Sequence, residues 1–336
     1  MKKYILKRLF QMIFIVVGIS LITFFIMHLI PGDPARVIAG PAGTAESIGR
    51  VRELMGLNKP LHIQLIDYYS KLIRFDFGES WFSGNPILYD ISNRLPATIE
   101  LLLIGFLIAV LIFVPLGVVI GFNPKGIANK ILNLYSLIAG AIPDFWLGLM
   151  MVLLFYVFFQ IVPPPLGRIA IGLEPTKVTG LYILDSILTA NIKSLLSAIN
   201  YIILPASCLA FVMGGPIIKM TISSIRETNN KDFMEYAKML GLNKKMLRKY
   251  SLKNSALPII TLIGVLFNYM ISGAIMIEMV FSWGGLGQYA VSAIINKDYN
   301  TIIAIVIFMS VVASLIYLFV DLIYFYLDPR IRSQIE

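Results

Sequence analysis

Six apolar runs divide this chain, and each is long enough to cross a lipid bilayer. They cover residues 9–30, 96–122, 131–162, 201–220, 258–281 and 301–327. A transmembrane helix needs about 20 apolar residues, because it rises about 1.5 Å per residue through a hydrocarbon layer about 30 Å thick. The sequence therefore predicts an all-α integral membrane protein with six transmembrane helices.

Composition supports a membrane protein and argues against a nucleic-acid partner. Hydrophobic residues make up 58% of the chain and charged residues only 14%, whereas soluble domains are about half apolar and a quarter charged. The net charge of +9 is explained by the basic residues that membrane proteins keep on one side of the bilayer. A single cysteine, Cys208, excludes a disulfide framework and a cysteine-based metal site.

The basic N-terminus followed by an apolar run resembles a cleaved signal peptide. The run at 9–30 is longer than an ordinary signal core, and no small-x-small cleavage site precedes the turn at 31–34. We therefore expect a retained membrane anchor.

The runs and the segments between them suggest four regions. Residues 1–30 form the N-terminus and the first transmembrane helix, and residues 31–95 form a small lobe with two amphipathic helices. Residues 96–327 form the main membrane domain, including a long polar loop at 219–258, and residues 328–336 form a short tail.

The distribution of basic residues predicts the orientation. The N-terminus, the loop at 123–130, the loop at 219–258 and the tail with Arg330 and Arg332 are basic and fall on one side. Because basic loops stay in the cytoplasm, both termini are expected inside the cell and the 31–95 lobe outside.

The loop at 219–258 is the longest polar interruption in the second half of the chain. Asn230 or Asp232 is placed to cap a short helix inside it, and the residues that would share one face are Phe233, Ala237 and Leu240. Gly241 follows where helices often end in a left-handed residue.

Asn243 is then placed to cap a second, basic helix that runs up to Pro258. Two interpretations of the whole loop remain open. It is either a docking platform for another protein or a solvated basic loop that only sets the membrane topology.

Ionisable residues inside the apolar runs are candidates for function, because a charge in the bilayer is costly unless it is paired or wetted. Asp144 follows Pro143 in a break at 142–148, which either lines a cavity or marks a packing kink. Glu278 lies near the outer end of the fifth run, where a pathway or gate role competes with an interhelical hydrogen bond. Asp321, near the cytoplasmic end of the sixth run, is assigned a structural role.

Motifs for catalysis are missing from the sequence. It contains neither a GxxxxGK[ST] phosphate loop nor an HExxH metal motif, and its only histidines are His28 and His62. We therefore expect no catalytic residue, no metal site and no bound cofactor. An intramembrane enzyme, the opposing hypothesis, would need an activity that depends on His28 or Asp144.

The segment EYAKMLGL at 235–242, followed by KNSALP, resembles the EAA loop of ABC-importer permeases. In that family the loop forms a coupling helix that docks into a separate ATPase subunit. Glu235, Ala237 and Gly241 occupy matching positions, Tyr236 replaces a residue that is often small, and Leu242 ends the segment.

Further motifs resemble the dipeptide, oligopeptide and nickel branch of these permeases. They are HLIPGDPA (28–35), FGES (77–80), NRLPATIEL (93–101), IPDFWLGL (142–149), GAIMIEMVFSWGGLGQY (273–289) and DLIYFYLDPRIR (321–332). The outer turn departs from the family, which commonly has proline and arginine where this chain has Gly284 and Gln288.

The resemblance implies a type I ABC importer permease fold in the cytoplasmic membrane. It implies four kinds of partner: a second homologous permease, two ATP-binding subunits that hold ATP and Mg, an external solute-binding protein, and the bilayer. Peptides, nickel chelates, glutathione-like solutes and sugars remain open as substrates. The alternative is a self-sufficient secondary transporter or channel, which the absence of an obvious inverted repeat disfavours.

Overall fold

A computed structural model describes residues 2–29, 33–40, 42–123 and 126–327. Within these ranges every regular element is a helix, and the one extended pairing is an isolated bridge between Glu79 and Pro86. The tail at 328–336 and the first two residues of the turn predicted at 31–34 lie outside the described residues. The all-α fold class is confirmed.

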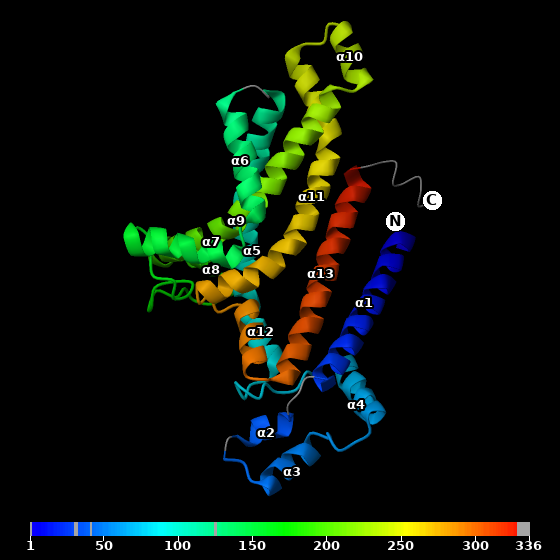
Figure 1. The fold of residues 1–336 in the computed structure, drawn as a ribbon, viewed down its shortest axis with the longest axis vertical. Coiled ribbons are helices and arrows are strands. Elements are labelled where there is room, and N and C mark those ends of the chain that lie inside the picture. Colours follow the sequence, from blue (N-terminus) through cyan, green and yellow to red (C-terminus); the bar gives the residue numbers. More distant parts are fainter. Residues whose placement is uncertain (1, 30–32, 41, 124–125, 328–336) are drawn as a thin grey trace. The chain divides into compact units, whose positions relative to one another are not determined.

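Five described helices are long and apolar enough to cross a membrane, and a bent pair makes up to six (Figure 1). The five segments are Arg8–Ile26, Ile87–Phe122, Ile192–Asn229, Lys244–Val280 and Tyr299–Phe319. The bent pair is Ile127–Ala141 with Asp144–Phe158, at an angle of 110°. Five unbroken spans and one broken span agree with the six apolar runs.

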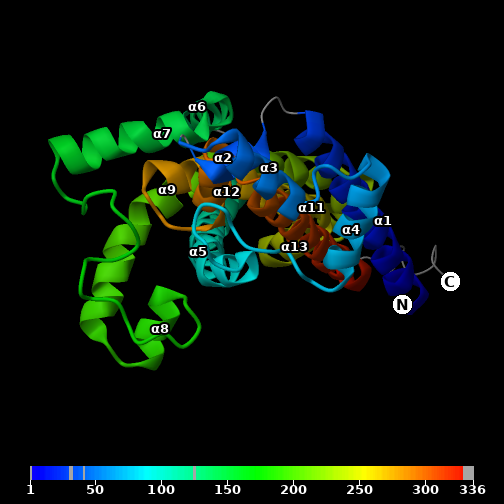
Figure 2. The same ribbon diagram turned by 90° about the horizontal axis from the view of Figure 1, so that it is seen from below.

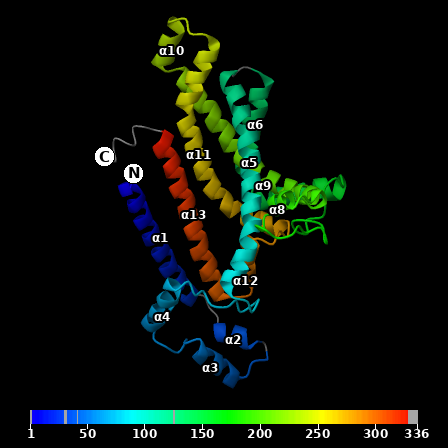
Figure 3. The ribbon, with the colours of Figure 1, turned by 180° about the vertical axis from the view of Figure 1, so that it is seen from behind.

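The chain divides into two compact units, of which the first comprises residues 1–95 and 288–315. It contains α1 (Lys2–Leu29), α2 (Pro34–Ala39), α3 (Ala45–Leu54) and α4 (Leu61–Ile73), with parts of α5 (Ile87–Phe122), α12 (Leu286–Ile295) and α13 (Tyr299–Leu327). Figure 3 shows α4 against the C-terminal half of α1. There the Tyr69 hydroxyl donates to the Val17 carbonyl at 3.2 Å, and the rings of Phe24 and Tyr68 are 5.4 Å apart.

Both helices expected in the 31–95 segment are present, and local sequence explains where they begin. The Thr44 hydroxyl accepts a hydrogen bond from the Ser47 amide and caps α3. Pro60 directly precedes α4, where a missing N–H costs nothing.

The second unit comprises Pro96–Gly287 and the chain from Ile316 onward. Its helices are α6 (Ile127–Ala141), α7 (Asp144–Met151), α8 (Tyr182–Leu188), α9 (Ile192–Asn229), α10 (Asp232–Met239) and α11 (Lys244–Val280), with a π-helical stretch at Val152–Phe158. The central pair is α9 and α11, and α6, α7 and α8 pack on α9. Figure 2 separates α7 from α8, which overlap in Figure 1.

Two predicted boundaries are wrong. The fourth apolar run is only the middle of α9, and α11 continues through Pro258, where the basic helix was expected to end and the fifth apolar run to begin. A proline removes one backbone donor, and packing of α11 on α9 compensates for that loss. The polar loop at 219–258 is therefore reduced to α10 and two short connections.

Candidate functional site

The short helix α10 joins α9 to α11 at the far end of the second unit (Figure 1). Lys231 precedes it in an extended conformation and makes no side-chain cap. The cap predicted at Asn230 or Asp232 is therefore wrong, because Asn230 instead closes the end of α9. Asp232 and Glu235 lie in the first turn of α10, where their negative charges interact favourably with the positive end of the helix dipole and stabilise the helix.

The C-terminus of α10 is closed by a complete Schellman motif. Gly241 has a φ of +75°, its amide donates to the Lys238 carbonyl at 3.0 Å, and the Leu242 amide donates to the Ala237 carbonyl at 3.3 Å. The predicted left-handed Gly241 is confirmed. The predicted cap at Asn243 is also confirmed, since its side chain accepts from the Met246 amide at 2.9 Å and starts α11.

The two faces of α10 differ in exposure. Met234 is 1% exposed and Ala237 is also buried. Tyr236 is 64% and Met239 76% exposed, and Glu235 is also exposed. Large exposed apolar side chains on a short helix are typical of a surface that binds another molecule.

A groove of about 400 Å³ runs between α10 and the first turns of α11. It is lined by Phe233, Tyr236, Ala237, Leu240, Leu242, Tyr250 and Asn254. The face predicted for Phe233, Ala237 and Leu240 is thus a wall of this groove. Of the five predicted coupling residues, Tyr236, Ala237 and Leu242 line the groove, Glu235 is exposed beside it, and Gly241 shapes its end.

The second candidate site surrounds Glu278, which is 0% exposed near the C-terminus of α11. The Thr98 hydroxyl on α5 donates to its carboxylate at 2.6 Å and accepts from the Leu286 amide at 2.8 Å. The Trp283 indole nitrogen donates to the Ala97 carbonyl at 2.9 Å. This network joins α5, the end of α11 and the segment at 281–287, which is a turn followed by the first two residues of α12.

Glycines in that turn allow it to close over the carboxylate. A side chain at Gly285 would collide with both the Glu278 carboxylate and the Thr98 hydroxyl, and one at Gly287 would lie 2.7 Å from Ile275 Cα. Gly285 and Gly287, two of the three glycines in the FSWGGLGQY segment, thus allow close packing on Glu278, which favours the hydrogen-bonding interpretation of this residue.

Asp144 is the first residue of α7, directly after the break with α6. Its carboxylate lies against the α-carbon of Gly273 on α11, at a position that a methyl group would need. Among the described residues it has no hydrogen-bond or ion-pair partner. The structure brings Asp144 and Glu278 to the same helix, α11, but with separate neighbours.

The sequence of this chain matches a known family of membrane transport components over most of its length. Residues 113–333 match the family described as "Binding-protein-dependent transport system inner membrane component". Residues 1–102 match the family that describes the N-terminal part of the membrane component of such systems. The chain belongs to this family.

Several permeases are similar to the chain over nearly its whole length. The "Probable D,D-dipeptide transport system permease protein DdpB" of Escherichia coli is 35% identical, over 97% of this chain and 96% of the relative. The "Dipeptide transport system permease protein DppB" of Alkalihalophilus pseudofirmus is 33% identical, over 99% and 100%. The Escherichia coli protein of that name is 31% identical, over 99% and 100%. The chain is a multi-pass inner-membrane permease subunit of an ABC importer.

The permease holds one buried ion pair that the sequence reasoning missed. Glu100 on α5 accepts from Arg168 at 2.5 Å and from the Ile183 amide at 2.7 Å. Arg168 also stacks over the Tyr182 ring at 3.8 Å. A lone glutamate inside the second apolar run could have indicated a buried ion pair. Its partner could not be identified from sequence, because Arg168 is 68 residues away. The pair fastens the connection before α8 to α5.

Proposed function

We propose that this permease imports short peptides, which an extracytoplasmic binding protein delivers, and that ATP hydrolysis on separate subunits drives the transport. The relatives above carry names of dipeptide permeases, and this chain matches 96–100% of their length. Their names favour peptides over nickel chelates, sugars or other small solutes.

The exposed face of α10 supports the proposal that this helix transmits the motion of the ATPase subunit to the membrane-spanning helices. Tyr236 and Glu235 contact the ATPase subunit directly, while Ala237, Gly241 and Leu242 hold the helix in shape. A short amphipathic helix that connects the ends of two long helices transmits a push to both of them. ATP-driven closure of the partner then tilts α9 and α11 between inward-open and outward-open states.

The basic residues around α10 support its placement in the cytoplasm. The first turns of α11 carry Lys244, Lys245, Arg248, Lys249 and Lys253, and the Arg248 guanidinium lies 5.5 Å from the centre of the Phe122 ring at the end of α5. With this end inside the cell, both termini are cytoplasmic and the 31–95 lobe is outside.

The assembly in this proposal contains a second homologous permease and two ATP-binding subunits. ATP and Mg bind to those subunits, and this chain binds no cofactor and performs no catalysis. Asp144, which has no polar partner among the described residues, belongs to the half of the translocation pathway that this chain contributes, because an intramembrane carboxylate is costly to retain without a task. Glu278 was the other pathway candidate, but its hydrogen bond from Thr98 gives it a structural role between α5 and α11.

Peptide uptake by reconstituted importer tests the proposal. Vesicles that hold the full complex and its binding protein are expected to accumulate a labelled dipeptide only when ATP is present on the side of the membrane that carries the ATPase subunits. Glu235→Ala and Gly241→Ala are expected to abolish uptake and loosen the ATPase subunits without lowering membrane abundance. Gly241→Ala strains the backbone by about 1–2 kcal/mol at a positive φ.

Gly140→Ala is the matched control, because a methyl group there meets nothing within 4 Å. Uptake by the permease alone, without ATP or partners, would instead establish a secondary transporter or channel. Normal uptake by both α10 variants would remove the coupling role from this helix.

A further inference from the structure

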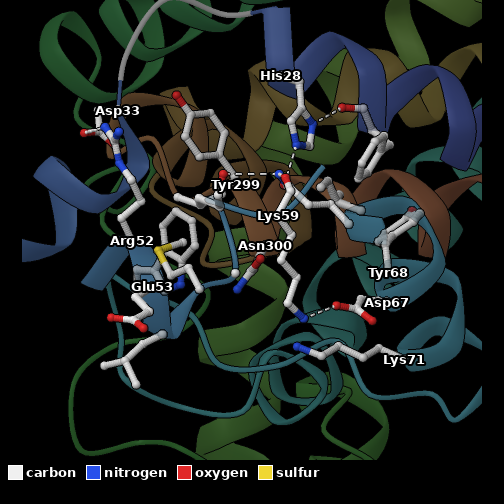
Figure 4. Close-up of a pocket in the computed structure, with 18 of the residues that line it drawn as sticks. His28, Asp33, Arg52, Glu53, Lys59, Asp67, Tyr68, Lys71, Tyr299 and Asn300 are labelled. Atoms are coloured by element: carbon white, nitrogen blue, oxygen red, sulfur yellow. Dashed lines mark hydrogen bonds and ion pairs between the residues drawn. The ribbon is translucent and has the colours of Figure 1, made fainter. Parts of the chain in front are cut away.

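A cavity of about 630 Å³ lies within the first unit, between the end of α1, the α3–α4 segment and the start of α13. Figure 4 shows the side chains around it, with His28 on α1, Arg52 and Glu53 on α3, and Tyr299 and Asn300 on α13. Its volume falls in the range of roughly 300–1,000 Å³ that small-molecule sites occupy. None of the residues assigned to coupling or to the membrane pathway lines this cavity.

The charges around the cavity balance. Three acidic and three basic side chains, besides His28, line it: Asp33, Glu53, Asp67, Arg52, Lys59 and Lys71. Four of them form two ion pairs, Arg52 with Asp33 at 2.5 Å and Lys59 with Asp67 at 2.7 Å. A lining without excess charge suits neither a polyanion nor a polycation, but it suits a zwitterion.

Glu53 and Lys71 are the two remaining charges, and among the described residues neither has an ion-pair partner. They come from different helices, α3 and α4, and Figure 4 shows them on opposite sides of the cavity. One carboxylate and one ammonium at opposite ends match the ammonium and the carboxylate of an extended short peptide.

Neutral hydrogen-bonding groups lie on the α13 side of the cavity. Tyr299 is 7% exposed, and its buried hydroxyl has no hydrogen-bond partner in the described part of the chain. The side-chain amide of the neighbouring Asn300 also has no partner there. A buried hydroxyl without a partner costs about 1–3 kcal/mol, which a ligand would recover.

The walls of the cavity are held in place by contacts between its own side chains. The His28 ring nitrogen Nε2 is 3.1 Å from the Gln64 side-chain oxygen, and the Gln64 amide donates to the Lys59 carbonyl at 2.8 Å. The Trp81 ring meets the Tyr299 ring edge-on at 5.9 Å. A pre-formed cavity binds more tightly, because little ordering remains to be done on binding.

We propose that this cavity binds a short zwitterionic peptide. Glu53 faces the ammonium group of the bound peptide, and Lys71 faces its carboxylate. The Tyr299 hydroxyl and the Asn300 side-chain amide form hydrogen bonds with the peptide bond between these two charged ends. The inference rests on the proposed function, since it takes peptides as the substrate class. It gives the permease a receiving site of its own, separate from that of the binding protein.

Direct binding to the intact importer, purified without its binding protein in lipid nanodiscs, tests this site. Calorimetry with L-alanyl-L-phenylalanine is expected to give saturable binding. The N-acetylated, C-amidated form of the same dipeptide is expected to bind at least about tenfold more weakly, because it offers neither charge. Absence of saturable binding to the wild-type importer overturns the inference.

Variants locate the binding. Glu53→Gln and Lys71→Gln are each expected to weaken it about tenfold, and Tyr299→Phe by a smaller factor without loss of folding. The matched controls are Glu46→Gln on the same helix, whose carboxylate is exposed and paired with Arg50, and Arg74→Gln beside α4. Equal loss in the controls overturns the assignment to this cavity.

Uptake in the presence of the binding protein separates this inference from the proposed function. Normal dipeptide uptake with no direct binding overturns the receiving site and leaves the function standing. Pocket variants that only weaken association of the binding protein overturn the site too, and make the cavity a protein-docking surface. Absence of uptake under all conditions overturns both.

Discussion

The carboxylate of Glu278 accepts a hydrogen bond of 2.6 Å from the hydroxyl of Thr98, which precedes it by 180 residues in the chain. Both residues are buried, and Thr98 also accepts from the Leu286 amide. A single hydroxyl therefore connects α5, the end of α11 and the first residue of α12. Loss of this hydroxyl must affect all three.

Thr98→Val is expected to lower the free energy of unfolding by about 1.5–3 kcal/mol, because it removes a hydrogen bond to a charged or acidic group without changing the side-chain shape much. Thermal unfolding of the importer in detergent, followed together with dipeptide uptake, measures the effect. A variant that loses uptake at unchanged stability would instead favour a gating role for Glu278.

Gly285→Ala is expected to be more damaging than Thr98→Val, because its methyl group would collide with both members of the pair. The segment at 281–287 must then move or the carboxylate must leave Thr98. Reduced membrane abundance and lost uptake are expected, and both are measured on the same membranes. Gly140→Ala, with open space around its α-carbon, should behave as wild type.

The buried and exposed faces of α10 predict different effects for two alanine substitutions, one on stability and the other on binding of the ATPase subunits. Met234→Ala empties a buried site and is expected to destabilise the helix by about 2–4 kcal/mol. Tyr236→Ala removes a side chain that is 64% exposed, so stability should stay within about 0.5 kcal/mol of wild type while ATPase association weakens. Co-purification of the ATPase subunits measures the second effect. Met246→Ala, exposed on α11, is the control, and equal losses there would contradict a surface specific to α10.

Local sequence predicted the C-terminus of α10 and the start of α11, although not the cap at the start of α10, because the contacts that fix these two positions are local. A glycine in the left-handed conformation and an asparagine that bonds an amide three residues later need only their immediate neighbours. The start of α11 was recognised for this reason. Its continuation through Pro258 was not, because it depends on packing against α9, a contact that no short window of sequence contains.

Non-local pairs account for the rest of what sequence could not predict. Glu100 and Arg168 are 68 residues apart and the loop between them hides the relationship. Pro143 marked the break in the third apolar run, but the 110° angle between α6 and α7 is set by the helices on which α7 packs. The cavity beside Tyr299 combines segments more than 200 residues apart, so its polar residues looked like ordinary surface.

Asp144 predicts a separation between stability and transport. Its carboxylate touches Gly273 and has no polar partner among the described residues, so Asp144→Asn should leave thermal unfolding nearly unchanged. Uptake is expected to fall about tenfold if the charge belongs to the pathway, a change of about 1.4 kcal/mol. Phe145→Leu, one residue on and exposed, controls for packing. Full uptake by the asparagine variant would support the packing-kink interpretation.

Asp185 predicts how stability changes with pH. Its side chain is buried at the start of α8, and burial alone would raise its pKa, but hydrogen bonds from Thr179, Gly180 and Val178 outweigh burial and hold the pKa below the ordinary 3.8. The charged form of Asp185 is therefore favoured in the folded protein. Its contribution to the free energy of unfolding is complete above the pKa that Asp185 has in the unfolded chain, and it is lost as the pH falls through the lower pKa of the folded protein.

Asp185→Asn is expected to lower the free energy of unfolding by about 2–3 kcal/mol at neutral pH. The difference in melting temperature from wild type should hold from about pH 8 to pH 5 and shrink below about pH 4, whereas the exposed control Glu174→Gln should match wild type throughout. A difference that persists undiminished in acid would show that the side chain's shape, not its charge, stabilises this corner of the fold.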